Sequence, residues 1–324
     1  MRALLSNDTR SSWTVAEVPP PAVGPDEVLV EVAAAGLNHA DLLMLSGAYT
    51  PSSADWNVPL DRVGFEMAGR VRGVGARVTG IEPGQYVMAQ TGGACAELVA
   101  VDHRLLLTAP ESLGPALAAG LPSALLTEYD ALTVAARLRP ADRVLITGGA
   151  GGVGHIGIQL ARALGASTVI ATTRSRAKAE LLLDLGATHV INTSTTDITS
   201  ALGPGAFDVC LDHLGGAVLA DLIGAAAPRA RVVQIGRLAG TRAALDLELL
   251  AARRLQLIGT TFRGRDADEL HALHADLRRD LPSLLRAHHV EPVIDSVFDL
   301  SEAGRAAERL ADSALTGKVV LRMT

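Results

Sequence analysis

The chain has 324 residues, 48% of them hydrophobic and 20% charged, so it is long enough for about two folded domains and too apolar for a disordered or fibrous protein. Its formal charge of −6 argues against general nucleic-acid binding, which requires a basic face. Two cysteines exclude a disulfide framework and a four-cysteine zinc lobe, and the lack of a signal-peptide pattern or a long apolar run predicts a cytoplasmic protein with no membrane span.

The first hundred residues predict a small β-rich domain. Short apolar strands are expected at 28–32, 67–74, 86–89 and 97–101, and Gly and Pro residues separate them. Short strands at such close spacing are typical of an antiparallel, barrel-like sheet.

From about residue 110, strand and helix patterns alternate along the chain. Apolar strands are predicted at 143–147, 168–172, 189–191, 208–212, 231–235 and 255–260. Helices such as 153–164 lie between them, and this alternation predicts a parallel sheet covered on both faces.

The C-terminal part is predicted to be mostly helical before one last strand. A helix is expected over 267–288 with a break at Pro282, and Ser301 is expected to cap a second helix. The strand at 318–323 has no helix after it, which suggests that it returns to the first domain.

A glycine-rich loop between a predicted strand and a predicted helix carries the clearest functional signal. Gly149, Gly151 and Gly154 form a GxGxxG pattern, with Gly152 and Val153 completing the turn. The glycines allow a tight turn, close approach of a pyrophosphate and close helix–strand packing, and the helix N-terminus attracts phosphate. The pattern in this context predicts a dinucleotide site.

The segment after the second strand of this region predicts which dinucleotide binds. An NAD site usually has an acidic residue there to hold the ribose 2′-hydroxyl, but no acid occurs before Glu180. The segment instead offers hydroxyl and basic groups that attract a 2′-phosphate, namely Thr172, Arg174, Arg176 and Lys178. We therefore expect NADPH as the cofactor, against the alternative of a solvated helix start in an Arg-rich chain.

Several further motifs occur together with this organisation. They are AGLNHADL at 35–42, SGAY at 46–49, GFEMAG at 64–69, Leu-Pro at 121–122 with Leu-Thr at 126–127, and GKVVL at 317–321. With these motifs the chain resembles the medium-chain dehydrogenase/reductase superfamily, in its zinc-free quinone oxidoreductase (zeta-crystallin-like) branch.

The resemblance implies an α/β fold with a Rossmann doubly wound parallel sheet and a β-rich GroES-like barrel domain. The catalytic GroES-like domain would comprise 1–121 and a return segment at 259–324, with the NADPH-binding Rossmann domain at 122–258. A homodimer joined through the sheet edge at 255–262 is also implied, since an exposed apolar strand needs covering.

No metal site is expected. Zinc-dependent members of the superfamily have Cys at the position of Asn38 and His at that of Phe65, and neither present side chain is a good zinc ligand. His271 and His274 are three residues apart on a predicted helix, where we expect a solvated face rather than a metal centre.

The resemblance implies NADPH-dependent, zinc-independent hydride transfer to a small electrophilic acceptor, a quinone or an activated alkene. Tyr49 would donate a hydrogen bond or proton to the acceptor, or form an aromatic wall; Asn38 would lie beside the nicotinamide ribose, or be a turn residue. Thr127, Phe262 and Arg263 match cofactor-contacting segments. Trp56 and Leu43 are expected to line the substrate pocket, with the alternative that Trp56 only caps the core.

Two departures from the family pattern bear on the site and on the activity. Glu128 follows Thr127 where family members often have Ala, and it is either a charge near the cleft or a surface residue. Leu43 takes the place of a second tyrosine found in some members. A specialised biosynthetic enoyl reductase or cyclisation enzyme on this fold, and an NADPH-binding structural or regulatory protein, therefore stay open as alternatives.

Overall fold

The chain divides into two compact units. The computed structural model describes residues 1–6, 12–45 and 61–323. Unit 1 consists of Met1–Ser123, Arg263–Pro282 and Glu291–Thr324, and unit 2 of Ala124–Phe262 and Ser283–Val290. Unit 2 thus extends past the expected boundary at 258, because Thr260 donates hydrogen bonds within it, from N to Gln234 O and from Oγ1 to Asp130 Oδ2.

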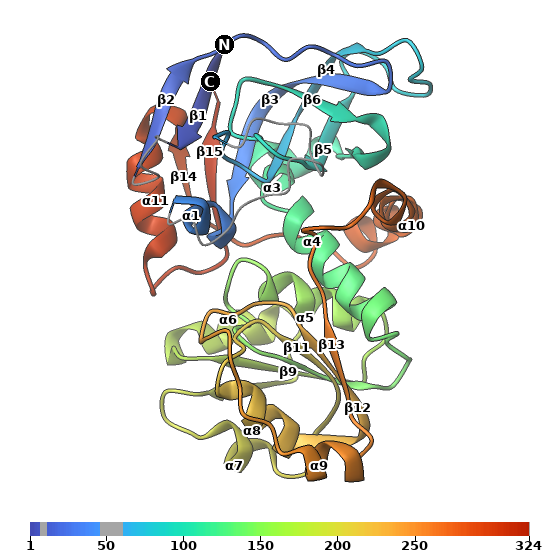
Figure 1. The fold of residues 1–324 in the computed structure, drawn as a ribbon, viewed down its shortest axis with the longest axis vertical. Coiled ribbons are helices and arrows are strands. Elements are labelled where there is room, and N and C mark those ends of the chain that lie inside the picture. Colours follow the sequence, from blue (N-terminus) through green and yellow to red (C-terminus); the bar gives the residue numbers. More distant parts are fainter. Residues whose placement is uncertain (7–11, 46–60, 324) are drawn as a thin grey trace. The chain divides into compact units, whose positions relative to one another are not determined.

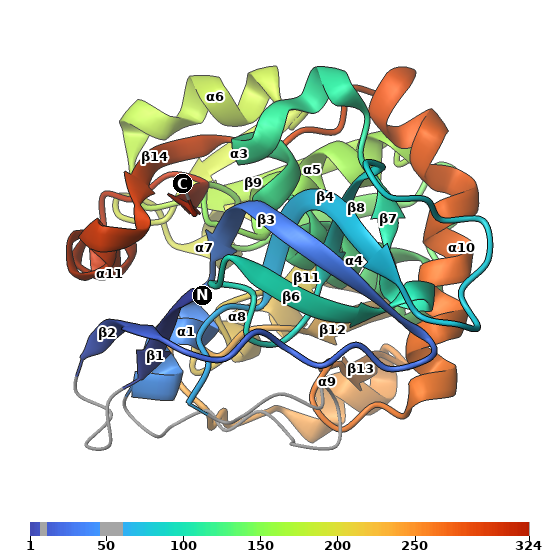
Figure 2. The ribbon, with the colours of Figure 1, turned by 90° about the horizontal axis from the view of Figure 1, so that it is seen from above.

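Unit 1 is built on a mainly antiparallel sheet. In the part of the chain that the structure describes, its strand order is β14-β15-β3-β4-β5-β7. Strand β3 pairs with both β4 and β6, which lie beside it in Figure 2. Among the described strands of this sheet, only β14 and β15 are parallel neighbours. The bounds are β3 Glu27–Leu37, β4 Glu66–Val74, β5 Tyr86–Gln90, β6 Leu98–Asp102, β7 Leu107–Thr108, β14 Ile294–Asp299 and β15 Lys318–Arg322. A separate hairpin is formed by β1 (Arg2–Ser6) and β2 (Trp13–Glu17).

The last strand returns to the first part of the chain, as predicted. In the register of β15 with β3, Val319 lies opposite Leu37 and Leu321 opposite Ala35. The short helix α3 (Gly114–Ala119) packs on β3 and β4, and α11 (Ala303–Ala311) packs on β14 and β15.

The entry to α11 differs from the prediction. The helix is preceded by a 3₁₀ turn, Leu300–Glu302, whose N-cap is Asp299 and not Ser301. Asp299 and Glu302 form a reciprocal capping box, in which each side chain accepts a hydrogen bond from the backbone of the other. Both Asp299 and Ser301 are residue types that cap helices, and the reciprocal glutamate three residues on selects Asp299.

The long helix α10 (Ala267–Arg286) continues through Pro282, so the predicted break at that residue is wrong. A proline in a helix removes one backbone hydrogen bond. Leucines at helical spacing nevertheless remain buried on one side of α10 along its whole length, at Leu270, Leu273, Leu277, Leu281 and Leu284. Their burial offsets the lost bond.

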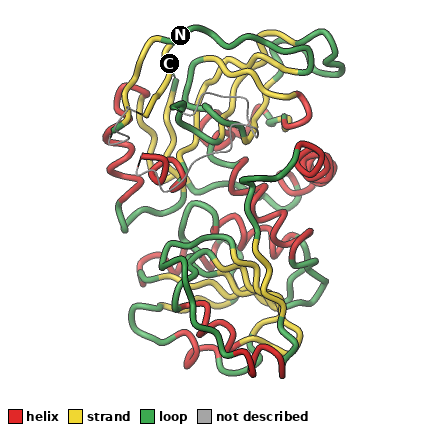
Figure 3. The backbone as a smooth tube through the Cα atoms, viewed as in Figure 1, coloured by secondary structure: helices red, strands yellow, loops and turns green. Residues whose placement is uncertain are grey.

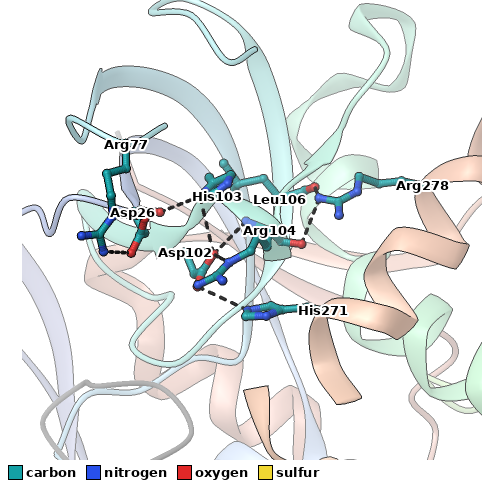
Figure 4. A network of polar contacts seen from close by, with 8 residues as sticks. All are labelled: Asp26, Arg77, Asp102, His103, Arg104, Leu106, His271 and Arg278. Atoms are coloured by element: carbon teal, nitrogen blue, oxygen red, sulfur yellow. Dashed lines mark hydrogen bonds and ion pairs between the residues drawn. The ribbon is translucent and has the colours of Figure 1, made fainter. Parts of the chain in front are cut away.

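The unit 1 part of α10 is attached to the sheet by a polar network (Figure 4). His271 Nε2 lies 3.3 Å from Asp102 Oδ2, and Arg278 Nη1 donates to Arg104 O at 2.9 Å. His274 is fully buried, its Nδ1 is 2.7 Å from Leu270 O, and burial lowers its pKa to about 4. The expected solvated face at these two histidines is therefore wrong, because α10 packs with that face inward.

Unit 2 is a parallel sheet covered by helices on both faces (Figure 3). Its strand order is β10-β9-β8-β11-β12-β13. The bounds are β8 Arg143–Ile146, β9 Thr168–Thr173, β10 His189–Asn192, β11 Phe207–Asp212, β12 Ala226–Gln234 and β13 Gln256–Gly259. Helices α5 (Gly154–Ala163) and α6 (Ala179–Asp184) cover one face, and α8 (Val218–Ala225) and α9 (Leu247–Ala252) the other (Figure 1).

This strand order confirms the predicted doubly wound fold and locates its switch point. The chain runs outward from β8 through β9 to β10, then returns to β11 and runs outward the other way to β13. In open parallel sheets, ligands bind at the carboxyl ends of the strands where the order reverses. In unit 2 that point lies between β8 and β11, and the glycine-rich loop follows β8 directly.

Helix α1 (His39–Leu45) of unit 1 is held at its start by a buried carboxylate. Asp41 accepts hydrogen bonds from the backbone N–H of Asn38 at 2.7 Å and of Gly64 at 3.0 Å. The side chain is fully buried, and burial raises the pKa of Asp41 to about 7 although the two amides act in the opposite direction.

The raised pKa predicts a pH-dependent contribution to stability. The folded state retains a proton that the unfolded chain releases near pH 4, so the contribution of Asp41 is full below that pH and is lost as the pH rises through about 7. We expect the stability difference between wild type and Asp41→Asn to fall by about 2.5 kcal/mol between pH 5 and pH 8. Denaturant unfolding at both pH values measures it, and an unchanged difference would contradict the protonated Asp41.

Candidate functional site

The loop after β8 is fixed to β9 through backbone hydrogen bonds. Gly149 N donates to Thr172 O at 2.8 Å, and Gly148 N donates to Thr172 Oγ1 at 3.1 Å. Within the loop, Gly151 N donates to Gly148 O at 2.9 Å. Three backbone amides are thereby used to set the shape of the turn.

Side chains are excluded at two glycines of the motif by close packing. A Cβ on Gly154 would lie 2.8 Å from Gly148 O, and a Cβ on Gly149 would lie 3.0 Å from Ala171 Cβ. Gly151 is less confined, with Gly148 O at 3.2 Å from such a Cβ, and Gly152 and Val153 are partly exposed. The turn therefore keeps its backbone accessible at Gly151 while the glycines on either side pack tightly.

The first turn of α5 opens directly from this loop. Its N-cap, Val153, makes no side-chain capping bond, and the Val153 carbonyl accepts from Ile156 N at 3.0 Å and from Gly157 N at 3.3 Å. His155 is buried and its Nδ1 lies 2.7 Å from Gly151 O, which ties the helix start to the loop. The helix dipole at such a start favours an anion.

The carboxyl end of β9 presents basic groups at the same edge of the sheet. β8 and β9 are parallel neighbours, with Ile146 opposite Ala171, so their carboxyl ends align. Arg174 and Arg176 are exposed there and Lys178 is half-buried. The hydroxyls of Thr172 and Thr173 are buried and accept backbone N–H bonds from Gly148 and Ser175.

A buried ionic pair lies beside the loop, and the sequence did not reveal it. Glu128, on α4 (Pro122–Tyr129), is fully buried, and its Oε1 lies 2.6 Å from His213 Nε2 at the end of β11. Burial alone would lower the pKa of His213, but the Glu128 carboxylate raises it above the usual value. The surface alternative for Glu128 is therefore wrong. His213 had no local motif to mark it.

Unit 1 contains a second buried cluster, around Asn38. Asn38 Nδ2 donates to Glu66 Oε1 at 2.8 Å, and Lys318 Nζ donates to Asn38 Oδ1 at 2.7 Å and to Glu66 Oε1. Glu66 Oε2 accepts from Ser123 N at 2.8 Å. Lys318 is 1% exposed, and it is one of only two lysines in the chain, a signal that could have identified it.

The environment of Asn38 and Phe65 bears on metal binding. The Asn38 amide is engaged on both sides by Glu66 and Lys318, and Phe65 is buried. Among the described residues, no group of three or more His, Cys, Asp or Glu side chains is arranged to hold a metal ion. Lys318 already brings a positive charge to Glu66.

The structure describes four of the remaining residues of the expected site. Leu43 is half-buried on α1, and Thr127 is half-buried on α4. Phe262 ends the central segment of unit 2, and exposed Arg263 begins the next segment of unit 1. Tyr49 and Trp56 fall outside the described residues.

Among the residues that the structure describes, no helix is both long and apolar enough to cross a membrane.

Comparison with known proteins identifies the family. Residues 24–124 match the alcohol dehydrogenase GroES-like domain, and residues 152–276 match the family described as zinc-binding dehydrogenase. A probable quinone oxidoreductase from Leishmania amazonensis is 32% identical, over 98% of this chain and 96% of its own length.

Solved structures agree. The quinone oxidoreductase of Thermus thermophilus, also solved in complex with NADPH, is 31% identical with a TM-score of 0.82, covering 100% of both chains. The CurK enoyl reductase is 26% identical with a TM-score of 0.85, covering 100% of this chain and 99% of that one. The chain is thus an oxidoreductase of the medium-chain dehydrogenase/reductase superfamily and belongs to its quinone oxidoreductase branch.

Proposed function

We propose that the protein is an NADPH-dependent, zinc-independent oxidoreductase that reduces a quinone or an activated alkene. The observation that carries the proposal is the basic carboxyl end of β9 beside the glycine-rich loop, where residues 172–178 include no carboxylate. The complex of the Thermus thermophilus relative with NADPH supports the choice of cofactor.

The residues of unit 2 fit NADPH in two places. The partly exposed turn at Gly151, Gly152 and Val153, at the positive end of the α5 dipole, would hold the pyrophosphate. Arg174 and Arg176, both exposed, would hold the 2′-phosphate by charge-assisted hydrogen bonds. The bound cofactor supplies the hydride for the reduction.

The residues of unit 1 would serve the acceptor. Tyr49 would donate a hydrogen bond or proton to the oxygen on which negative charge develops, which lowers the barrier electrostatically; as an aromatic wall it would shape the pocket instead. Asn38 is held in one orientation by Glu66 and Lys318, so its remaining amide proton has a fixed direction, which would serve the ribose. Lys318 provides a fixed cation beside Glu66, and no zinc ion is required for that charge.

A specialised enoyl reductase is the second candidate, favoured by the likeness to the CurK enoyl reductase. It predicts slow turnover with simple quinones and fast turnover with one enoyl thioester. A cofactor-binding structural or regulatory role predicts dinucleotide binding without oxidation by any acceptor.

We also propose a homodimer through β13, which is the edge strand of the unit 2 sheet and in which Leu257 is 40% exposed. A monomeric mass in solution would refute the homodimer.

Cofactor choice can be tested at the two arginines. Replacing Arg174 and Arg176 by Ala is expected to raise the KM for NADPH about tenfold or more and to change that for NADH little, because only NADPH carries the 2′-phosphate. Arg139→Ala is the control, since this exposed arginine precedes the amino end of β8, at the opposite edge of the sheet. Equal use of NADH by the wild type would contradict the proposal.

Acceptor class and metal independence can be tested together. NADPH oxidation, followed by absorbance, is expected with a quinone, enone or enal, and a chelator should leave the rate unchanged. Tyr49→Phe should lower kcat by about tenfold to a hundredfold if the phenol donates a proton. Loss of activity on chelation would refute zinc independence, and full activity of Tyr49→Phe with every good acceptor would leave only the aromatic-wall role.

A further inference from the structure

A continuous chain of contacts leads from α4 to the glycine-rich loop. Glu128 Oε1 lies 2.6 Å from His213 Nε2, and His213 Nδ1 lies 2.8 Å from Thr147 O. The backbone N–H of His213 donates to Thr147 Oγ1 at 2.8 Å. Thr147 is the residue immediately before Gly148, so the side chain of Glu128 reaches the first residue of the turn through a single histidine.

The hydrogen bonds define the protons of this pair. A backbone carbonyl only accepts, so Nδ1 of His213 must carry a proton. The short contact between Nε2 and Glu128 Oε1 needs a second proton, shared by the ring and the carboxyl group. The pair is therefore an imidazolium–carboxylate contact or its neutral tautomer, and in both forms the imidazole is held at both nitrogens.

The carboxyl group of Glu128 also packs against the start of α5. A Cβ on Gly157 would lie 2.8 Å from Glu128 Cδ and 2.9 Å from its Oε2, so a side chain at this helix position would force the Glu128 carboxyl group to move. Gly157 belongs to the first turn of α5. Glu128 thus contacts the end of β11 through His213, the end of β8 through Thr147, and α5 directly, which are the three elements around the loop.

The end of β11 is fixed by a second carboxylate. Asp212 Oδ1 accepts a hydrogen bond from Thr147 Oγ1 at 3.2 Å and from Leu214 N at 3.0 Å. Asp212 is fully buried as well. The backbone of His213 is therefore held in place by its hydrogen bond to Thr147 and by the neighbouring Asp212. Its ring links Glu128 on α4 to the carbonyl oxygen of Thr147.

We propose that the Glu128–His213 pair is a positioning device that holds the glycine-rich loop and the first turn of α5 in the pyrophosphate-binding arrangement before the cofactor binds. The inference rests on the proposed dinucleotide binding by unit 2. Burying a charged pair adds little net stability, because desolvation offsets the attraction. Holding a binding site in its bound shape instead lowers the ordering cost of binding, and that gain appears as affinity.

A matched pair in the same sheet separates positioning from simple stabilisation. Asp208 and Arg143 join the same two strands, β11 and β8, at their amino ends, with Arg143 Nε 2.9 Å from Asp208 Oδ2. Breaking the Arg143–Asp208 pair removes an ionic contact between β8 and β11, and breaking the Glu128–His213 pair removes one between α4 and the end of β11. Of these two pairs, only Glu128–His213 lies at the carboxyl ends of the strands, where the glycine-rich loop begins.

The experiment measures the NADPH dissociation constant by fluorescence titration and the Tm of each variant without cofactor. Glu128→Ala and His213→Ala are expected to weaken NADPH binding about tenfold. Asp208→Ala breaks a partly exposed pair, so it should lower Tm less than the other two variants and change the dissociation constant less than about twofold. A weakening of NADPH binding that follows the loss of Tm in the same proportion in all three variants would overturn the proposal, because the pair would then act only through stability.

Two further variants test the geometry itself. Glu128→Gln keeps the shape and can donate to the Nε2 of a neutral His213, so its affinity should stay within about twofold of wild type. Gly157→Ala should weaken binding in the wild-type background, where its methyl group meets the Glu128 carboxyl, and have no further effect in Glu128→Ala. Equal effects of Gly157→Ala on NADPH binding in both backgrounds would overturn the proposal. A Glu128→Gln variant that binds NADPH as weakly as Glu128→Ala would overturn it as well.

The outcomes also separate this inference from the proposed function. A wild type that binds neither NADPH nor NADH overturns both. A wild type that binds NADPH, together with an unchanged dissociation constant in Glu128→Ala, overturns only the positioning role. Activity with an acceptor is not needed for either measurement.

Discussion

The nucleotide-binding unit depends on how closely its backbone folds back on itself between β8 and α5. The carbonyl oxygen of Gly148 occupies space that a side chain on Gly154 would need, and Gly149 packs against Ala171 on the neighbouring strand. A methyl group at either position would push the loop away from the helix or from β9. The hydrogen bonds from Gly148 and Gly149 to Thr172 depend on this close approach.

Each unit places buried charge, and not only apolar side chains, beside its sequence motif. In unit 1, Lys318, Glu66 and Asn38 form hydrogen bonds with one another, and in unit 2, Glu128 and His213 do so. Such groups lose their hydration when buried, so each must find a partner of defined geometry. Their value lies in fixing the position of neighbouring backbone: Ser123 at Glu66, and Thr147 at His213.

The errors of prediction have separate physical causes. Pro282 was expected to break a helix, but one lost hydrogen bond is small beside the buried leucines on the same face of α10. Ser301 and Asp299 are both good caps, and only the reciprocal contact with Glu302 distinguishes them. His271 and His274 were placed on a solvated face because local spacing does not show that Asp102 lies next to α10.

The sequence by itself determined the parallel and antiparallel sheets, the glycine-rich turn, the basic segment after β9 and the return of the last strand. These features depend on periodicity, on residues close together in the chain, and on motifs of fixed spacing. Only the tertiary structure decided which charges meet: Glu128 with His213, and Glu66 with Lys318, partners separated by 85 and 252 positions. Pairing over such distances is set by strand order and packing, and a local pattern carries no information about it.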